Sequence, residues 1–242
     1  MVSARNNLDV SAYFVVGPEN TKGRPVGGII RAVIEARYTC LQIRSKNATA
    51  SELIALAREA ADIIADANRS DAVALLINDR LDVILAARAF GIKVDGIHIG
   101  QLDMPVEVCR RYLGEDSIVG LSARSHDMLD YIQTTDVGEI DYFGVGPLRE
   151  TQTKPDCGLG LDGEVLTMSF DDISTLANIS SIPVVVGGGV KLFDIPSLAR
   201  TGADGFFVVS AISEADNPRA EAAKLIEAWK ENFRPKSLHK RL

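Results

Sequence analysis

Several segments of this chain gather side chains that bind phosphorylated ligands. Residues 42–46 carry two cations and an amide, residues 78–80 and Asp103 add an amide and two carboxylates, and residues 151–154 add two hydroxyls and a cation. Arg and Lys bind anions through charge-assisted hydrogen bonds. Mg2+ prefers a few carboxylates together with phosphate oxygens. These residue types predict a site for a polyphosphate that shares Mg2+ with the protein.

Each of these residues also has a simpler interpretation. A single Lys or Arg after a strand usually forms no more than a surface ion pair. Asp79 and Asp103 each precede a predicted helix, which either could cap. His98 falls within a predicted strand, where a lone His is more often a hydrogen-bonded core residue than a catalyst. The combination of Gln42, Arg44 and Lys46 nevertheless favours a ligand site. Side chains alternate along a strand, so these three would point the same way if the strand extended that far.

Eight short runs rich in β-branched residues predict buried strands. They lie at 12–16, 40–43, 73–77, 96–99, 118–121, 142–145, 183–186 and 205–209. Helical patterns occur between them, at 50–67 (with Ser51 as the expected cap), 81–90, 106–113, 192–201 and 218–229. Alternating strands and helices pair in parallel through right-handed crossovers, so we expect one closed (β/α)8 TIM barrel. A doubly wound open sheet is the alternative, and both folds bind ligands at the carboxyl ends of strands.

Length and composition fit one barrel domain over residues 1–242, with a core at about 12–232 and a flexible tail at 233–242. A net charge of −7 excludes the basic surface of a nucleic-acid-binding protein. No apolar run reaches the roughly 20 residues of a membrane helix, and no secretory leader is evident. We therefore expect a cytoplasmic enzyme, which could form a homo-oligomer. In that compartment Cys40, Cys109 and Cys157 should be reduced thiols, and Cys40 should be buried.

A second phosphate site is expected where the seventh and eighth strands end. Gly188 and Gly189 follow the seventh strand, and Val209 and Ser210 close the eighth. TIM barrels frequently bind phosphate there through backbone N–H groups, and glycine permits the close backbone approach that this requires. A glycine pair alone would indicate only a tight turn, so the location carries the prediction.

The order and spacing of these motifs resemble the thiamine phosphate synthase family, over roughly residues 12–212. The matching segments are 42–46, 78–80, 98–105, 144–147, 151–154, 188–189 and 209–210. The resemblance implies that 4-amino-5-hydroxymethyl-2-methylpyrimidine diphosphate condenses with 4-methyl-5-(2-hydroxyethyl)thiazole phosphate, or with its 2-carboxy form. The products would be thiamine phosphate and pyrophosphate. The cofactor would be Mg2+, and the partners would be these small molecules alone.

The resemblance also implies a role for each matching residue. Metal ligands would be Asp79 and Asp103, and catalytic residues would be Arg44, Lys46, Ser122 and Lys154. The pyrimidine diphosphate would contact Gln42, Arg44, Lys46, Asn78, Ser122 and Lys154, and the thiazole phosphate would contact Thr151, Thr153, Gly188, Gly189, Val209 and Ser210. Substrate would also contact Ile43, Ser45 and Gln152. From the residues alone, Ser122 could equally cap a helix. Catalysis would depend on electrostatics and positioning, with no strong side-chain base.

The chain departs from the family pattern at four places. Residues 16–18 read Val-Gly-Pro where relatives often carry Thr-Asp, and Gly187 replaces an aliphatic residue. Arg149 and Glu150 occupy a usually apolar stretch, and the loop at 155–169 is long. A thiazole tautomerase, a non-catalytic barrel that binds a thiamine precursor, and a sugar-phosphate epimerase or isomerase are the alternatives. The cations and the carboxylate pair argue against all three.

Overall fold

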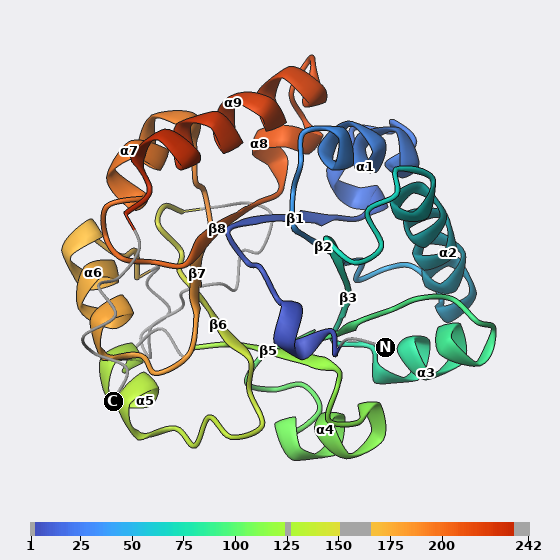
Figure 1. Cartoon of the computed structure of the whole chain (residues 1–242), viewed down its shortest axis with the longest axis horizontal. Helices are drawn as coiled ribbons and strands as arrows, with labels where there is room; N and C mark the ends of the chain where they lie inside the picture. Colours follow the sequence, from blue (N-terminus) through green and yellow to red (C-terminus); the bar gives the residue numbers. More distant parts are fainter. Residues whose placement is uncertain (1–2, 124–126, 151–165, 235–242) are drawn as a thin grey trace.

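Eight parallel strands close into a barrel in chain order (Figure 1). The computed structural model describes residues 3–123, 127–150 and 166–234. The strands are β1 (Ala12–Val16), β2 (Cys40–Ile43), β3 (Ala74–Asn78), β4 (Gly96–Ile99), β5 (Ile118–Ser122), β6 (Tyr142–Val145), β7 (Val184–Val186) and β8 (Gly205–Val208). β1 pairs with β8 as well as with β2. The predicted barrel is confirmed and the open sheet is excluded.

Helices surround the barrel on its outside (Figure 1). They are α1 (Val26–Glu35), α2 (Ala50–Asp66), α3 (Leu81–Ala89), α4 (Val106–Leu113), α5 (Met128–Thr134), α6 (Phe170–Ile179), α7 (Ile195–Leu198), α8 (Ser210–Ser213) and α9 (Pro218–Asn232), with 3-10 turns η1 (Arg5–Asn7), η2 (Pro18–Asn20) and η3 (Leu192–Asp194). No helix in the described part of the chain is both long and apolar enough to cross a membrane.

Most predicted helices are confirmed within a few residues, and two expectations are corrected. The expected helix at 192–201 is split into η3 and the short α7, which carries Pro196 in its first turn, where proline is favoured. The cap of α2 is Thr49, whose hydroxyl accepts from the Glu52 N–H at 3.3 Å, while Glu52 accepts from the Thr49 N–H at 2.7 Å. Ser51 lies inside the first turn, because the helix begins one residue before it.

Apolar side chains form two separate cores. The larger one fills the space between the strands and the surrounding helices. The smaller one fills the barrel interior with alternate residues of the strands, among them Tyr13, Leu76, Tyr142 and the fully buried Cys40. Cys40 and Cys109 are free thiols, as expected, and Cys157 lies outside the described residues. The barrel is therefore a packed core and leaves ligands only its rim.

A repeated contact joins the strands at their amino ends. The residue before each even-numbered strand exchanges two hydrogen bonds with one residue of the preceding strand. Its N–H donates to the carbonyl of that partner, and its side-chain oxygen accepts the N–H of the partner. The four pairs are Thr39 with Ala12, Asp95 with Leu75, Asp141 with Val119, and Asp204 with Val184. A short acceptor at each position satisfies a buried N–H where the pairing of neighbouring strands begins.

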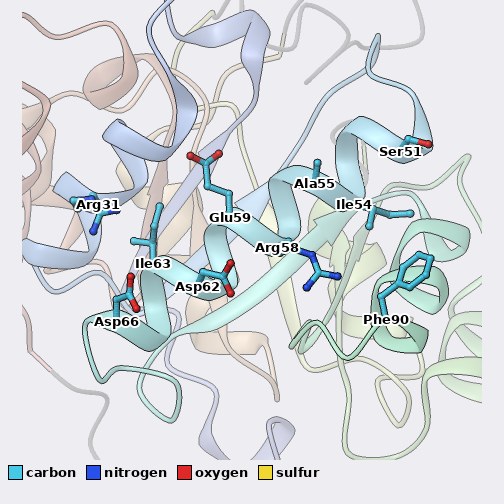
Figure 2. A pocket seen from close by; sticks show the side chains of 10 residues that line it. All are labelled: Arg31, Ser51, Ile54, Ala55, Arg58, Glu59, Asp62, Ile63, Asp66 and Phe90. Atoms are coloured by element: carbon cyan, nitrogen blue, oxygen red, sulfur yellow. The ribbon is translucent and has the colours of Figure 1, made fainter.

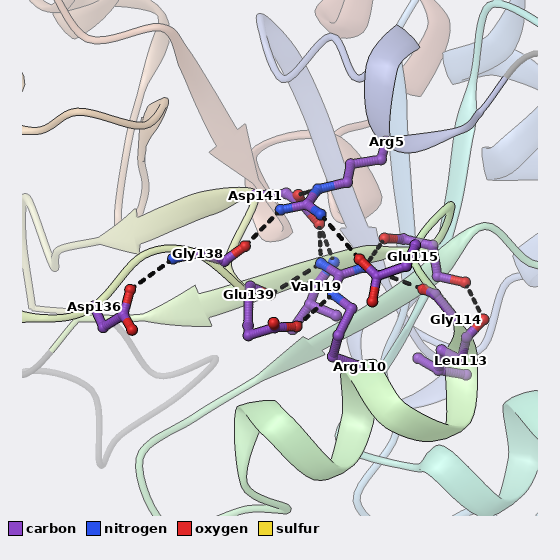
Figure 3. Close-up of polar contacts among 11 residues, drawn as sticks. Arg5, Arg110, Leu113, Gly114, Glu115, Val119, Asp136, Gly138, Glu139 and Asp141 are labelled. Carbon is purple, nitrogen blue, oxygen red and sulfur yellow. Dashed lines mark hydrogen bonds and ion pairs between the residues drawn. The ribbon is translucent and has the colours of Figure 1, made fainter.

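Asp141 extends this contact into a buried ionic cluster (Figure 3). Its carboxylate lies 2.5 Å from Arg5 Nε and 2.8 Å from an Arg110 terminal nitrogen. The side chains of Asp141 and Arg110 are only 5% and 3% exposed. Arg110 also donates to the Glu139 carbonyl at 2.9 Å. The cluster ties η1 and α4 to the start of β6, at the end of the barrel opposite the predicted ligand site.

We predict that Asp141→Asn lowers the free energy of unfolding by roughly 3 kcal/mol, because the buried Arg110 loses its buried counter-charge and keeps only the half-exposed Glu139 as an ionic partner. Urea denaturation measures the change. Asp82→Asn is the matched control: it removes an exposed partner of Arg80 and should cost less than about 1 kcal/mol. Equal losses in the two variants would contradict the structural importance of the cluster.

Candidate active site

The carboxyl ends of β2, β3 and β4 bring together Lys46, Asp79 and Asp103. Lys46 Nζ lies 3.2 Å from Asp79 Oδ2. Burial, together with the negative charge of Asp103 and a hydrogen bond between the two carboxyl groups, raises the pKa of Asp79 above its usual value. Two neighbouring carboxylates repel each other, so a bound cation between them would be stabilised. The structure thus places these three residues together, at the ends of three consecutive strands.

Neither carboxylate caps the helix that follows it. The residue before α3 is Arg80 and the residue before α4 is Pro105, and neither helix has a side-chain capping bond. Asp79 instead adopts a left-handed backbone conformation with φ +61°, and its N–H donates to the His98 carbonyl at 2.9 Å. Such a conformation is unfavourable for a non-glycine residue and is frequent at functional sites. Asp79 therefore does not cap α3.

Asp103 is positioned by a tight turn after β4. Its Oδ2 accepts the Gly100 N–H at 2.7 Å, and its own N–H points to the Gly100 carbonyl at 3.4 Å. The intervening Gln101 donates to the Ser122 carbonyl at 2.6 Å and to the Tyr131 hydroxyl at 2.9 Å. Sequence reasoning did not find this bridging role of Gln101, because both partners are distant in the chain.

The two carboxylates fit Mg2+ better than a metal held by protein alone. Among the described residues, no group of three or more His, Cys, Asp or Glu side chains could hold a metal ion. Mg2+ commonly binds through one or two carboxylates and completes its octahedron with water and phosphate oxygens. Asp79 and Asp103 supply that number of hard oxygen ligands, beside a lysine that also attracts phosphate.

The loop that carries the cations is held by a residue that sequence reasoning missed. Glu19, in η2, accepts hydrogen bonds from the Ser45 hydroxyl and from the backbone N–H groups of Lys46 and Asn47, the latter two at 3.2 Å. Burial opposes ionisation, but these hydrogen bonds outweigh it and lower the pKa of Glu19. The Glu19 carboxylate thereby shapes the backbone of the loop that follows β2.

The alignment of Gln42, Arg44 and Lys46 required the strand to extend beyond Ile43, and this condition is not met, since β2 ends at Ile43 as the predicted strand does. Gln42 lies inside the barrel and donates from Nε2 to the Tyr13 hydroxyl at 3.0 Å. Ile43 is fully buried in the outer core, which leaves only its backbone for a ligand. Arg44 and Lys46 lie beyond the strand, in the turn that Glu19 holds, because the chain leaves the sheet there.

Ser122 ends β5 and points at His98 rather than at a helix. Its hydroxyl lies 2.9 Å from His98 Nε2, and Asp127 is the residue before α5. His98 Nδ1 lies 2.8 Å from the Tyr142 hydroxyl. Helix capping by Ser122 is therefore excluded. Asn78 ends β3, the strand on the other side of β4, where it pairs with His98.

The glycine pair and the start of α8 lie at the ends of the last two strands. Gly188 and Gly189 have φ +78° and +73°, and a Cβ on Gly188 would come within 2.6 Å of Pro147 Cα. Val209 precedes α8, and Ser210 is its first residue. The first N–H groups of a helix have no partner within it, so they suit an anion. The predicted Thr151, Gln152, Thr153 and Lys154 lie outside the described residues.

An ion pair that sequence reasoning missed joins the loops after β6 and β7. The Arg149 guanidinium bonds to the carboxylate of Asp194, a residue that is 2% exposed. The same guanidinium lies over the Phe193 ring, 4.8 Å from its centroid. Leu148 and Arg149 also donate their N–H groups to the carbonyls of Gly187 and Gly188 at 3.1 and 3.0 Å. These contacts position the glycine pair.

A surface hollow also occurs on the outside of the barrel, over α2 (Figure 2). It is lined by side chains of both charges, including Arg58, Glu59 and Asp62, with Phe90 at one side. These residues belong to helices and to a helix end rather than to the ends of strands. The strand-end site is therefore the candidate active site.

Comparison with known proteins gives the family of this chain. A family model described as thiamine monophosphate synthase matches residues 12–212. The chain belongs to this family. The thiamine-phosphate synthase of Chloroflexus aurantiacus is 36% identical over 93% of this chain and 94% of its own length. That of Natronomonas pharaonis is 34% identical over 91% of this chain and 95% of its own.

Solved structures agree on the fold of this thiamine monophosphate synthase family member. A thiamine phosphate pyrophosphorylase from Pyrococcus furiosus superposes with a TM-score of 0.74, with 24% identity over 95% of this chain and 99% of that one. A 3-hexulose-6-phosphate synthase from Salmonella typhimurium reaches 0.62 with 16% identity, over 93% and 100% of the two chains. Barrels with other activities thus share the architecture, and the site residues must distinguish them.

We predict that Glu19→Ala weakens the binding of Mg2+-pyrophosphate about tenfold, because the loop that carries Arg44 and Lys46 loses three hydrogen bonds. Isothermal titration calorimetry measures the affinity. Glu35→Ala, which removes an exposed partner of Arg219 on the outer helices, is the control. Tighter binding by Glu19→Ala would mean that the negative charge of Glu19 opposes the ligand more than its hydrogen bonds help.

Proposed function

We propose that this chain is a thiamine phosphate synthase that joins a pyrimidine diphosphate to a thiazole phosphate and releases pyrophosphate. The observation that carries the proposal is the meeting of Asp79, Asp103 and Lys46 at one rim of the barrel. A polyphosphate needs both a metal and cations, and this rim offers ligands for both. The names of the relatives, which align over more than nine-tenths of the chain, supply the substrate class.

In the proposed reaction, the bond between the pyrimidine methylene carbon and the diphosphate oxygen breaks, and the electron pair leaves with pyrophosphate. The amino-substituted pyrimidine spreads the positive charge that remains on the methylene. The thiazole nitrogen then forms the new carbon–nitrogen bond with its lone pair. No proton has to be removed, which agrees with the lack of a strong base among the site residues.

The protein would contribute charge and position. Arg44, Lys46 and Lys154 would stabilise the negative charge that develops on the departing diphosphate, since fixed cations cost no reorganisation during the reaction. Asn78 and the backbone of Ile43 and Ser45 would hold the same group, with Gln42 and Ser122 on the pyrimidine. When bound by Asp79 and Asp103, Mg2+ would supply further positive charge to the diphosphate oxygens.

The thiazole phosphate would bind on the other side of the rim. Gly188 and Gly189 permit a close approach of the backbone, and Val209 and Ser210 lie where the first N–H groups of α8 begin. Thr151, Gln152 and Thr153 would complete this phosphate site. Its place on the barrel rim, four strands from the carboxylates, would keep the thiazole phosphate group away from the diphosphate, while the two rings meet between them.

Incubation of the purified chain with both substrates tests the function. We expect thiamine phosphate and pyrophosphate in equal amounts with Mg2+, and neither with EDTA. Product formation that survives EDTA would remove the metal from the proposal. Binding of thiazole phosphate without product would favour the tautomerase or the non-catalytic barrel.

We predict that Asp103→Ala lowers kcat/KM at least about 100-fold, a loss of transition-state stabilisation of roughly 2.7 kcal/mol, without changing the melting temperature greatly. Part of the loss should return at high Mg2+ concentration, because one carboxylate remains. Steady-state kinetics across a Mg2+ series measure both effects. Asp82→Ala, on the adjacent α3, is the control, and wild-type turnover by folded Asp103→Ala would refute the role.

A further inference from the structure

A continuous line of hydrogen bonds crosses the barrel interior from β2 to β5. Gln42 Nε2 lies 3.0 Å from the Tyr13 hydroxyl, which lies 2.9 Å from the Tyr142 hydroxyl. The Tyr142 hydroxyl lies 2.8 Å from His98 Nδ1, and His98 Nε2 lies 2.9 Å from Ser122 Oγ. The two ends of this line, Gln42 and Ser122, are both residues proposed to contact the pyrimidine. Tyr13, Tyr142 and His98 have no role in the function proposed above.

The line depends on the absence of a side chain on Gly120. In the barrel, His98 pairs with Gly120 on one side, and Gly120 pairs with Tyr142 on the other. The rings of His98 and Tyr142 stack over this gap, 5.5 Å apart. A Cβ on Gly120 would lie 2.1 Å from Tyr142 Cζ. The glycine therefore makes the contact between these two side chains sterically possible.

Each phenol in the line has one proton to donate. Burial raises the pKa of Tyr13 and Tyr142 well above the usual value, so both hydroxyls stay protonated. Because the Gln42 amide group donates to Tyr13, the Tyr13 proton is available to Tyr142, and the Tyr142 proton then points at His98 Nδ1. Neutral imidazole carries one proton, so with Nδ1 as the acceptor the proton is on Nε2.

The opposite polarity would require weaker pairings. His98 would have to donate from Nδ1 to the Tyr142 oxygen, although a phenol is the better donor and an imidazole nitrogen the better acceptor. Cys40, which also contacts Tyr13, competes poorly for the phenol proton, because sulfur is a weak acceptor. The direction Gln42 to Tyr13 to Tyr142 to His98 to Ser122 therefore gives each strong acceptor a strong donor.

We propose that this hydrogen-bond relay makes Ser122 a donor toward the substrate, with Tyr142 as the positioning residue that fixes the tautomer of His98. His98 Nε2–H donates to Ser122 Oγ, so the hydroxyl proton of Ser122 remains for the ligand. The site then selects a ring that presents a nitrogen lone pair to Ser122. The inference rests on the proposed function, because the ligand ring is the pyrimidine of the proposed substrate.

The kinetic test compares Tyr142→Phe with a matched control. The variant keeps the ring and removes the link, so we expect kcat/KM for the pyrimidine diphosphate to fall about tenfold or more. Tyr38→Phe should leave kcat/KM unchanged, because Tyr38 is equally buried but its hydroxyl has no hydrogen-bond partner among the described residues. Unchanged kinetics in folded Tyr142→Phe would overturn the positioning role.

A substrate analogue separates positioning from general stability. In the two pyridine analogues of the diphosphate substrate, a C–H replaces one or the other ring nitrogen. The wild-type enzyme should discriminate against one of them, and this discrimination should shrink in Tyr142→Phe and persist in Tyr38→Phe. A loss of activity in Tyr142→Phe with the discrimination intact would indicate a structural effect only, and would overturn the proposal.

The tautomer of His98 can be observed without turnover. The chain has three histidines, so 15N-histidine labelling gives few ring signals, and His98→Gln assigns the one of interest. We expect Nε2 protonated and Nδ1 unprotonated in the wild type, with this preference lost in Tyr142→Phe. A protonated Nδ1 in the wild type would overturn the relay even if the enzyme is active. The predicted tautomer in a chain without synthase activity would support the relay and reject the proposed function.

Discussion

The limited space inside the closed barrel is the constraint on which the site depends. Three large inward side chains each lie against a glycine, in the pairs Tyr142 with Gly120, His98 with Gly144, and Phe207 with Gly187. A Cβ would lie 2.1 Å from the Tyr142 and Phe207 rings and 3.0 Å from the His98 ring. A protein interior packed at crystal-like density leaves no other room for such rings. Two of these rings are polar, so their hydroxyl and nitrogen atoms must find partners inside the barrel. The hydrogen-bond relay from Gln42 to Ser122 is the arrangement that satisfies them.

The two ends of the barrel use their polar groups in opposite ways. At the amino end, Asp141 is surrounded by two guanidinium groups and a backbone N–H, so its charge is compensated within the fold. At the carboxyl end, Asp79 and Asp103 face each other with one half-exposed lysine nearby, and Asp79 adopts an unfavourable backbone conformation. The first arrangement compensates a buried charge within the fold, whereas the second holds two neighbouring carboxylates whose repulsion a bound cation would lower.

Local patterns in the sequence were sufficient for the barrel and for its strand ends. The β-branched runs located all eight strands to within two residues, because strands buried on both faces read as continuous apolar segments. Helices α1, α5, α6 and α8 were missed. In α1, Gly27 and Gly28 in the first turn weaken the helical pattern. Glu19 and Gln101 were also missed, because their partners are 26 and 21 residues away. No local pattern marks an interaction that only the closed fold creates.

The departures from the family pattern after β6 and β7 have a common physical explanation. Gly187, where the family resemblance implies an aliphatic residue, leaves the space that the Phe207 ring of the next strand occupies. Arg149, in a stretch that the resemblance implies to be apolar, is neutralised by the buried Asp194 and covered by Phe193. Each change is thus compensated by a neighbouring residue, and the backbone of Gly188 and Gly189 keeps its left-handed conformation. Because these changes lie beside the proposed thiazole phosphate site and not beside the carboxylates, any selectivity particular to this chain should concern the thiazole substrate.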